Sequence, residues 1–182
     1  MLASDRIIVL VGLMGSGKSR IGALLAKLLK VPFVDVDREI EYAANYTISE
    51  IFERFGEKEF RRGEQEVMLR LLSGGPRVLA SGGGAFIQPI IKKAIKEKAI
   101  SVWLKATLDT LLLRTSRTNH RPLLQGVNAA ERLQKLMEER YPLYAEADIT
   151  VVSDDQTPQD TAWIIKAELE KLARRENKKE TP

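Results

Sequence analysis

Short apolar runs alternate along the chain with longer segments whose apolar residues recur at helical spacing. The runs predict five strands, at residues 7–11, 31–34, 77–80, 100–104 and 149–152. Runs that are apolar on both faces are typical of strands buried in a parallel sheet. Because helical segments separate the runs, the pattern predicts an α/β fold, a three-layer sandwich in which helices cover both faces of a five-stranded parallel sheet.

The stretch between the second and third predicted strands is too long for one crossover helix. The pattern predicts three helices here: from about Arg38, from Thr47, and over residues 57–72. Thr47 and Glu50 have the spacing of a capping box, and Gly56 lies where a C-cap would end the middle helix. We therefore expect an inserted, substrate-binding helical lobe at about residues 35–74.

A second interruption, at about residues 115–127, is polar and rich in arginine, which is typical of a mobile loop. We expect a lid there. A helix is predicted from Asn128, which Pro142 ends or kinks, and a last helix follows Pro158. The expected organisation is one domain over residues 1–182, with its core at about 1–34, 75–114 and 128–174 and a frayed, charged tail at 175–182.

The composition narrows the chemistry. The 182 residues are 44% apolar and 30% charged, as in an ordered globular domain. The absence of cysteine excludes disulfides, cysteine-bound zinc, iron–sulfur clusters and thiol catalysis, and it fits a cytoplasmic protein. A single histidine, His120, excludes multi-histidine metal sites. The net charge of +4 suits a small anionic ligand as well as nucleic acid, and no apolar run is long enough to span a membrane.

Residues 12–19, GLMGSGKS, match the phosphate-binding pattern G-x-x-x-x-G-K-[ST] in full. The segment follows a predicted strand and opens a predicted helix, as such a loop requires. Its glycines let backbone N–H groups turn toward phosphate oxygens, Lys18 would reach the β- and γ-phosphates, and the Ser19 hydroxyl would ligate Mg²⁺. The pattern predicts binding of a nucleoside triphosphate and leaves the second substrate open.

Asp35 and Asp37 follow the second predicted strand, at the carboxyl edge of the sheet where ligands bind. Residues two apart on an extended segment point the same way, so both acids could serve one site, one near hydrated Mg²⁺ and one near an acceptor hydroxyl. Alternatively, Asp37 is the N-cap of the following helix. The spacing alone does not decide between these interpretations.

Three further features each allow two interpretations, one structural and one involving a ligand. Glu64 falls on the apolar stripe of its helix and needs a partner, which Arg61 can supply; the pair is either structural or holds Arg61 for an anion. The glycines at 82–84 form either a ligand contact or a loose turn. Arg140, on the apolar face of its helix, either extends to solvent or binds an anion in a cleft.

Arginines gather at the second interruption, where Arg114, Arg117 and Arg121 lie close together in sequence. They form either a solvated charged loop or part of a lid that closes over ATP, adds positive charge at the transferred phosphoryl group and excludes water. His120 is interpreted as a bystander.

Together these segments resemble the shikimate kinase family over about residues 6–173. The matching elements are residues 12–19, Asp35-Val36-Asp37, Phe60-Arg61 with Glu64, residues 82–84, residues 121–124, and Arg140 before Pro142-Leu143-Tyr144. The resemblance implies a nucleoside-monophosphate-kinase-like P-loop fold with a substrate-binding lobe and a lid. It implies Mg²⁺-dependent transfer of the γ-phosphate of ATP to the 3-hydroxyl of shikimate, a step of chorismate and aromatic amino-acid biosynthesis.

The resemblance also implies roles for single residues. Lys18, Asp37 and Arg121 would be catalytic, with Asp37 as the proton acceptor. The ATP-binding residues would be Gly12, Gly15, Ser16, Gly17, Lys18, Ser19, Arg20, Arg114, Arg121 and Gln156, and the metal would be held by Ser19 and, through water, Asp35. The shikimate-binding residues would be Asp37, Arg61, Glu64, Gly82, Gly83, Gly84 and Arg140, with both arginines on its carboxylate.

One position departs from the pattern of many P-loop enzymes. The third strand ends Leu79-Ala80-Ser81, without the aspartate that many P-loop enzymes carry there, which shifts magnesium ordering onto Ser19 and Asp35.

Other functions fit the residues less well. The main alternative is another small-metabolite kinase, such as a gluconate kinase. The aspartate pair suits an acceptor with hydroxyls better than the nucleoside monophosphate that a nucleoside monophosphate kinase binds. A GTPase would need an Asn-Lys-x-Asp segment, and the sequence has none. A nucleic-acid binder would need a set of aromatic stacking residues, which is not evident here. An inactive kinase scaffold stays open. We expect no nucleic-acid or membrane partner, and the resemblance implies a monomer.

Overall fold

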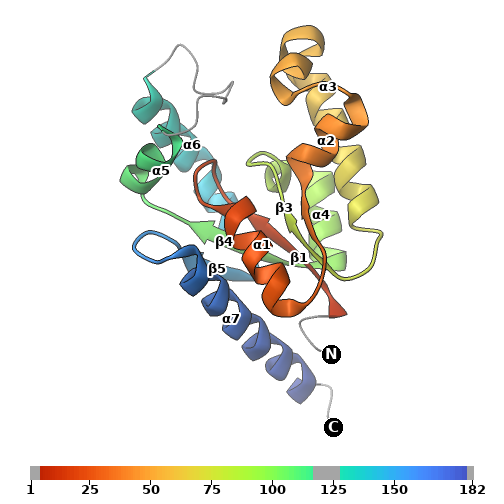
Figure 1. Cartoon of the computed structure of the whole chain (residues 1–182), viewed down its shortest axis with the longest axis vertical. Helices are drawn as coiled ribbons and strands as arrows, with labels where there is room; N and C mark the ends of the chain where they lie inside the picture. The colour runs from red at the N-terminus through yellow and green to blue at the C-terminus, as the bar shows by residue number, and fades with distance from the viewer. Residues whose placement is uncertain (1–4, 117–127, 180–182) are drawn as a thin grey trace.

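The computed structural model describes residues 5–116 and 128–179 and has a central sheet with helices on both faces (Figure 1). Five parallel strands lie in the order β2-β3-β1-β4-β5. Their bounds are β1 Ile7–Val11, β2 Phe33–Asp35, β3 Arg77–Ala80, β4 Ala99–Lys105 and β5 Ile149–Val152. The predicted three-layer α/β architecture is confirmed.

The helices divide between the two faces of the sheet. Their bounds are α1 Lys18–Leu29, α2 Val36–Ala44, α3 Ile48–Leu71, the short 3₁₀ helix η2 Ala85–Ile87, α4 Pro89–Lys98, α5 Leu108–Thr115, α6 Ala129–Tyr144 and α7 Pro158–Lys179. Alternate residues of β1 point to opposite faces: Ile8 and Leu10 pack in one core cluster with α1 and α7, whereas Val9 and Val11 pack in another with α3, α4 and α6. None of the described helices is long and apolar enough to cross a membrane.

The strand order places a ligand crevice at the end of β1. From β1 the chain passes beyond β3 to form the edge strand β2, and after β3 it crosses β1 to continue on the other side as β4. The loop after β1 therefore emerges where the connections diverge to opposite sides. In open α/β sheets this is where ligands bind, outside the carboxyl ends of the strands.

The start of the inserted lobe differs from the prediction. Asp35 is the last residue of β2 and also the N-cap of α2, because its side chain accepts a hydrogen bond from the backbone N–H of Asp37. The helix therefore begins at Val36 rather than near Arg38. The expectation that Asp35 and Asp37 share an extended segment is wrong, and so is the interpretation of Asp37 as the cap.

Local signals elsewhere in this lobe are confirmed. Thr47 and Glu50 form the predicted capping box at the start of α3. Gly56, with φ 78° and ψ 172°, interrupts α3, as expected for a glycine that ends one helix and lets another begin.

Three boundaries near the ends of elements also differ. Lys30 adopts a left-handed conformation at the end of α1, so the chain turns before β2 begins at Phe33 rather than at residue 31. Helix α6 continues two residues past Pro142 to Tyr144. Helix α7 reaches Lys179, so the tail is helical over its first residues rather than frayed from residue 175.

Helices α4 and α5 were not individually predicted, because they are short, at 10 and 8 residues, and a short apolar pattern does not distinguish a helix from a strand. Each lies on a core face through a few buried residues, such as Ile91 and Ile95 in α4 and Leu111 in α5. Of the predicted lid, only Thr115, at the end of α5, and Ser116 are described. Residues 117–127 lie outside the described part of the chain.

Candidate functional site

The loop between β1 and α1 forms the floor of the site. Gly12, Gly15 and Gly17 have φ values of 139°, 82° and 94°, in a region that favours glycine. A Cβ at Gly12 would also lie 2.7 Å from the Leu104 carbonyl oxygen. Gly17 precedes α1 without a side-chain cap, and the first turn holds no acid, so the N-terminal N–H groups and the positive end of the helix dipole are left for an anion.

Two side chains of this loop add polar groups to the cradle. The Lys18 ammonium donates hydrogen bonds to the carbonyl oxygens of Gly12 and Leu13, at 2.8 and 2.9 Å. Ser16 is buried, and its hydroxyl has no hydrogen-bond partner among the described residues. The predicted strand–loop–helix context of residues 12–19 is thus present in the structure.

A cleft of about 1050 Å³ opens from this loop toward the inserted lobe. Its lining combines the phosphate loop with side chains of α2, α3 and α6 and with the glycine loop after β3. The residues that line it are Met14, Gly15, Gly17, Lys18, Ser19, Arg20, Asp35, Asp37, Glu41, Thr47, Ile48, Ser49, Phe52, Phe60, Arg61, Glu64, Ala80, Ser81, Gly82, Gly83, Gly84, Arg114 and Arg140. Most of the residues predicted for both substrates therefore share one cavity.

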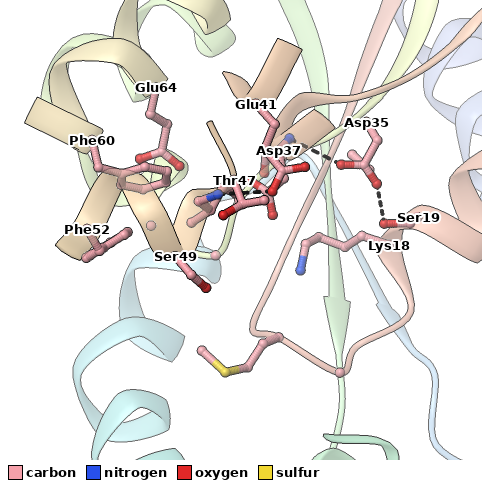
Figure 2. A pocket seen from close by; sticks show the side chains of 18 of the residues that line it. Lys18, Ser19, Asp35, Asp37, Glu41, Thr47, Ser49, Phe52, Phe60 and Glu64 are labelled. Carbon is pink, nitrogen blue, oxygen red and sulfur yellow. Dashed lines mark hydrogen bonds between the residues drawn. The ribbon is translucent and has the colours of Figure 1, made fainter. Parts of the chain in front are cut away.

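Asp35 connects the phosphate loop to the inserted lobe (Figure 2). Its Oδ2 accepts a hydrogen bond of 2.6 Å from the Ser19 hydroxyl, and its Oδ1 accepts one of 3.2 Å from the N–H of Asp37. A hydroxyl and a carboxylate at this position are hard oxygen donors of the kind that Mg²⁺ prefers. Within residues 5–116 and 128–179, no three His, Cys, Asp or Glu side chains gather as a metal site of their own. A divalent cation here would complete its shell from phosphate oxygens and water.

Asp37 is the acid whose proton affinity the site changes most clearly. Burial, followed by the nearby Asp35 carboxylate, raises the pKa of Asp37 to about 6, although Lys18 acts in the opposite direction. A carboxylate with this pKa is ionised at neutral pH and is also a better proton acceptor than an ordinary aspartate. These are the properties of a general base.

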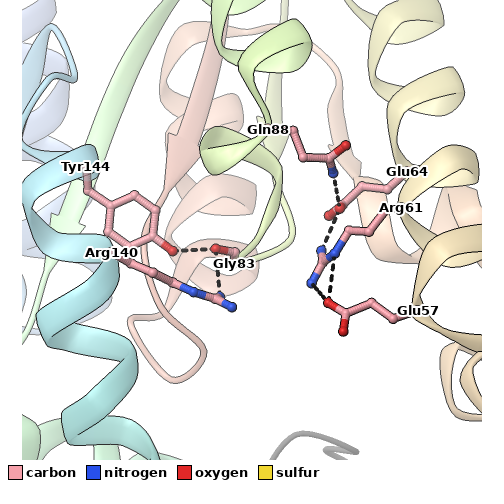
Figure 3. Close-up of polar contacts among 7 residues, drawn as sticks. All are labelled: Glu57, Arg61, Glu64, Gly83, Gln88, Arg140 and Tyr144. Carbon is pink, nitrogen blue, oxygen red and sulfur yellow. Dashed lines mark hydrogen bonds and ion pairs between the residues drawn. The ribbon is translucent and has the colours of Figure 1, made fainter.

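Arg61 is held by carboxylates on both edges of its guanidinium group (Figure 3). NH1 donates to Glu64 Oε2 at 2.7 Å, while Nε and NH2 donate to Glu57 Oε1 at 3.3 and 3.1 Å. Gln88 donates a further 2.7 Å hydrogen bond to the same Glu64 oxygen. The predicted contact between Arg61 and Glu64 is present. Glu57 and Gln88 were not predicted; the i−4 spacing of Glu57 from Arg61 was a usable signal, whereas Gln88 carried none.

Glu64 is fully buried, and its burial raises its pKa, which Arg61 lowers only in part. The second carboxylate oxygen, Oε1, has no hydrogen-bond partner in the described part of the chain. A Cβ at Gly82 would lie 2.6 Å from that oxygen and 3.0 Å from Asp37 Oδ1. The glycine at 82 therefore leaves room for both acids, which a loose turn would not require.

Arg140 faces the cleft from the opposite side (Figure 3). Its NH1 donates a 3.1 Å hydrogen bond to the Gly83 carbonyl oxygen, and the Tyr144 hydroxyl donates to the same oxygen. Arg140 is thus partly buried beside the glycine loop instead of extending to solvent. Tyr144 was not predicted as part of the site.

Of the remaining residues predicted to bind ATP, the structure describes Arg20, Arg114 and Gln156. Arg20 and Arg114 line the cleft, and Arg114 NH2 donates to the Ser153 carbonyl oxygen at 2.6 Å. Gln156 is exposed in the loop after β5 and is not among the lining residues. Arg121 lies outside the described residues, as do Arg117 and His120.

The sequence comparisons agree with this geometry. The family model described as "Shikimate kinase" matches residues 14–179. The chain is 51% identical over 158 residues to a shikimate kinase of Bartonella henselae, covering 87% of this chain and 75% of that protein. It is 54% identical over 156 residues to a shikimate kinase of Paramagnetospirillum magneticum, covering 86% and 80%.

The structural comparisons separate this family from its neighbours. A shikimate kinase from Acinetobacter baumannii, solved in complex with shikimate, has a TM-score of 0.86 and 40% identity, covering 90% of this chain and 92% of that chain. A gluconokinase from Sinorhizobium meliloti has a TM-score of 0.57 and 20% identity, covering 97% and 99%. The second likeness extends to the fold alone.

Proposed function

This chain belongs to the shikimate kinase family, and we propose that it transfers the γ-phosphate of ATP to the 3-hydroxyl of shikimate, giving shikimate 3-phosphate and ADP. It is a kinase, a phosphotransferase with an alcohol acceptor. One observation carries the acceptor assignment: Arg61, Arg140 and Asp37 converge on the glycine loop beside the phosphate cradle. Shikimate is a small carboxylate with several hydroxyls, so its groups complement this set.

ATP would place its phosphates along residues 12–19. The backbone N–H groups of the loop and the N-terminus of α1 would bind phosphate oxygens, with Lys18 moving from its loop carbonyls to the β- and γ-phosphates. Arg20 and Arg114 would add positive charge from the cleft wall. Adenine contact by Gln156 and phosphate contact by Arg121 stay predictions from the resemblance.

Mg²⁺ is part of the proposal, because Ser19 and Asp35 present suitable oxygens at the phosphate end of the cleft. When bound, the ion would neutralise part of the charge on the phosphates. Ser19 would ligate it directly, and Asp35 would act through water. The existing Ser19–Asp35 hydrogen bond keeps both groups together before the nucleotide arrives.

The acceptor carboxylate would lie between Arg61 and Arg140. Guanidinium groups bind carboxylates through paired N–H donors, so two arginines on opposite walls can fix both the position and the orientation of the ring. Gly82, Gly83 and Gly84 would contact the ring through backbone, and Glu64 would hold Arg61 in place. Asp37 would then face the ring hydroxyls.

In the chemical step, the 3-hydroxyl oxygen attacks the γ-phosphorus and forms the new P–O bond. The bond from the γ-phosphorus to the bridging oxygen breaks, and that oxygen leaves with ADP. Asp37 accepts the hydroxyl proton, for which its raised pKa suits it. Most of the rate enhancement would come from positioning the two reactants and from positive charge around the phosphoryl group.

A monomeric state, a cytoplasmic location and the absence of nucleic-acid and membrane partners also stay predictions from the sequence. Gel filtration coupled to light scattering measures the first of these directly.

The test is ADP release by the purified protein with Mg-ATP, comparing shikimate, gluconate, AMP and no acceptor. We expect strong turnover with shikimate alone. Turnover with gluconate instead would preserve the cradle and overturn the acceptor assignment. ATP binding without turnover on any acceptor would indicate a binding or scaffold protein.

A further inference from the structure

Tyr144 is a buried tyrosine near the end of α6 to which the proposed reaction gives no role. Its side chain is fully buried, and its hydroxyl donates a hydrogen bond to the Gly83 carbonyl oxygen (Figure 3). Arg140, one helical turn earlier, donates to the same oxygen through NH1 at 3.1 Å. A carbonyl oxygen has two lone pairs, so it can accept both bonds at once.

The Gly83 carbonyl lies at the junction between the two substrate sites. A Cβ at Gly83 would lie 3.5 Å from the Gly12 carbonyl oxygen and 3.8 Å from the Met14 nitrogen, so this glycine packs directly against the phosphate loop. It has no side chain to anchor it. Its position therefore depends on the hydrogen bonds that its backbone receives.

We propose that Tyr144 is a positioning residue for the acceptor, which acts by fixing the Gly83 carbonyl and, through it, Arg140. This inference rests on the proposed function, because Arg140 matters only if an acceptor carboxylate binds there. When Arg140 turns part of its guanidinium group toward that carboxylate, Tyr144 keeps the Gly83 oxygen bonded. The glycine loop then stays at its distance from the phosphate loop while the acceptor binds.

Two properties suit Tyr144 to this role. Its ring packs in a cluster with Trp103 and Tyr141, with centroid distances of 6.0 and 6.3 Å, so the hydroxyl has a fixed direction. Burial raises the pKa of Tyr144 to about 12, so the phenol keeps its proton and remains a donor at every pH at which the enzyme would work.

Tyr141 provides a matched control within the same helix and cluster. Its ring lies 4.9 Å from that of Trp103, and its hydroxyl donates a 2.5 Å hydrogen bond to the Ala106 carbonyl oxygen. Ala106 follows β4 and is not among the residues that line the cleft. Tyr141→Phe and Tyr144→Phe therefore each remove one hydroxyl bonded to a backbone carbonyl, and only Tyr144→Phe removes one from the acceptor loop.

The experiment compares both variants with the wild-type protein by calorimetric titration of shikimate, by KM for shikimate and for ATP, and by Tm. Loss of one hydrogen bond from the loop is expected to raise the Kd and KM for shikimate about five- to tenfold in Tyr144→Phe. The KM for ATP should stay within about twofold of wild type. Tyr141→Phe should leave both KM values unchanged, even if its Tm falls as much as the Tm of Tyr144→Phe.

A second arm tests the route through Arg140. If Tyr144 acts through the shared carbonyl, the effects of Arg140→Ala and Tyr144→Phe on shikimate binding should be clearly less than multiplicative in the double variant. Multiplicative effects, equal shifts in both KM values, or a Tm loss without any change in shikimate binding would each overturn the proposal. Failure of the wild-type protein to bind or phosphorylate shikimate would instead overturn the proposed function.

Discussion

The phosphate side and the acceptor side of the cleft are built in different ways. The phosphate side comes from one contiguous segment, residues 12–19, and consists largely of backbone N–H groups at the start of α1. The acceptor side consists of side chains from three helices, with Asp37 from α2, Arg61 from α3 and Arg140 from α6, gathered around a glycine loop. The phosphate side is thus a local structure, whereas the acceptor side exists only when distant segments have packed.

The two sides also differ in their electrostatics. The phosphate side presents N–H groups, a helix N-terminus and the Lys18 ammonium, so it is positive before any ligand binds. The acceptor side contains the half-buried carboxyl of Asp37 and the fully buried carboxyl of Glu64, and partial or full removal from water raises the pKa values of both. Burying these charges opposes folding, so the acceptor side holds a conflict between stability and function that the phosphate side lacks.

The largest effect is expected at Asp37, where the acceptor side meets the chemistry. Asp37→Asn removes the proton acceptor and should lower kcat about 10²- to 10⁴-fold, with little effect on the KM for ATP. In the wild-type enzyme kcat/KM for shikimate should fall as the pH drops through about 6, because the protonated carboxyl cannot accept a proton. Steady-state rates between pH 5 and about 8 measure both effects. An acidic limb that persists unchanged in Asp37→Asn would assign it to another group.

The acceptor arginines come next in expected size. Arg61→Ala or Arg140→Ala should weaken transition-state binding by about 2–5 kcal/mol, the scale for leaving a buried charge partner unpaired. The loss should fall on kcat/KM for shikimate and spare the KM for ATP. Arg62→Ala is the control, since Arg62 is exposed and pairs only with Glu59 and Glu66 among the described residues. Wild-type-like kinetics in both test variants would contradict carboxylate capture.

On the phosphate side, Lys18→Met should show the opposite selectivity. The substitution removes a charged donor that would bind the phosphates, so kcat should fall about 10²- to 10³-fold and the affinity for ATP should fall as well. The affinity for shikimate, measured without nucleotide, should stay unchanged. Lys27→Met, on the exposed surface of the same helix, should leave both unchanged. Calorimetric titration of each substrate separates these outcomes. An equal decrease in the affinities for ATP and for shikimate would mean that the phosphate side and the acceptor side are not independent.

The smallest effect concerns stability rather than rate. Folding raises the pKa of Asp37 from 3.8 to about 6 because the folded state disfavours the ionised carboxylate. The free energy of unfolding is therefore undiminished by this group below pH 3.8, and it falls as the pH rises through 6 and the carboxyl ionises. Asp37→Asn should therefore be more stable than wild type at neutral pH, by about 2–3 kcal/mol. The gain should shrink as the pH falls from 6 toward 4. Urea unfolding at several pH values measures it, with Glu53→Gln on the exposed face of α3 as the control.

Much of the fold could be predicted, because local patterns determine it. The apolar runs placed β1, β3 and β5 at their observed bounds, since buried strands need continuous apolar residues. The Thr47–Glu50 capping box and the break at Gly56 were recognisable because caps and glycine breaks act over a few residues. Boundaries near Asp35 were missed because an acid at a strand end can also cap a helix, and spacing cannot tell these apart.

The candidate site likewise has one part that local sequence specifies and another that depends on tertiary packing. By itself, the sequence determined the phosphate loop, because a contiguous run of glycines, a lysine and a serine between a strand and a helix specifies its own backbone conformation. Only the tertiary structure decided that Glu57 and Gln88 flank the Arg61–Glu64 pair, and that Arg140 and Tyr144 share the Gly83 carbonyl. Gly83 and Tyr144 are 61 positions apart, and no local pattern links them. Their contact arises from the packing of α6 beside the glycine loop after β3, and such long-range geometry is set by the whole core rather than by any one segment.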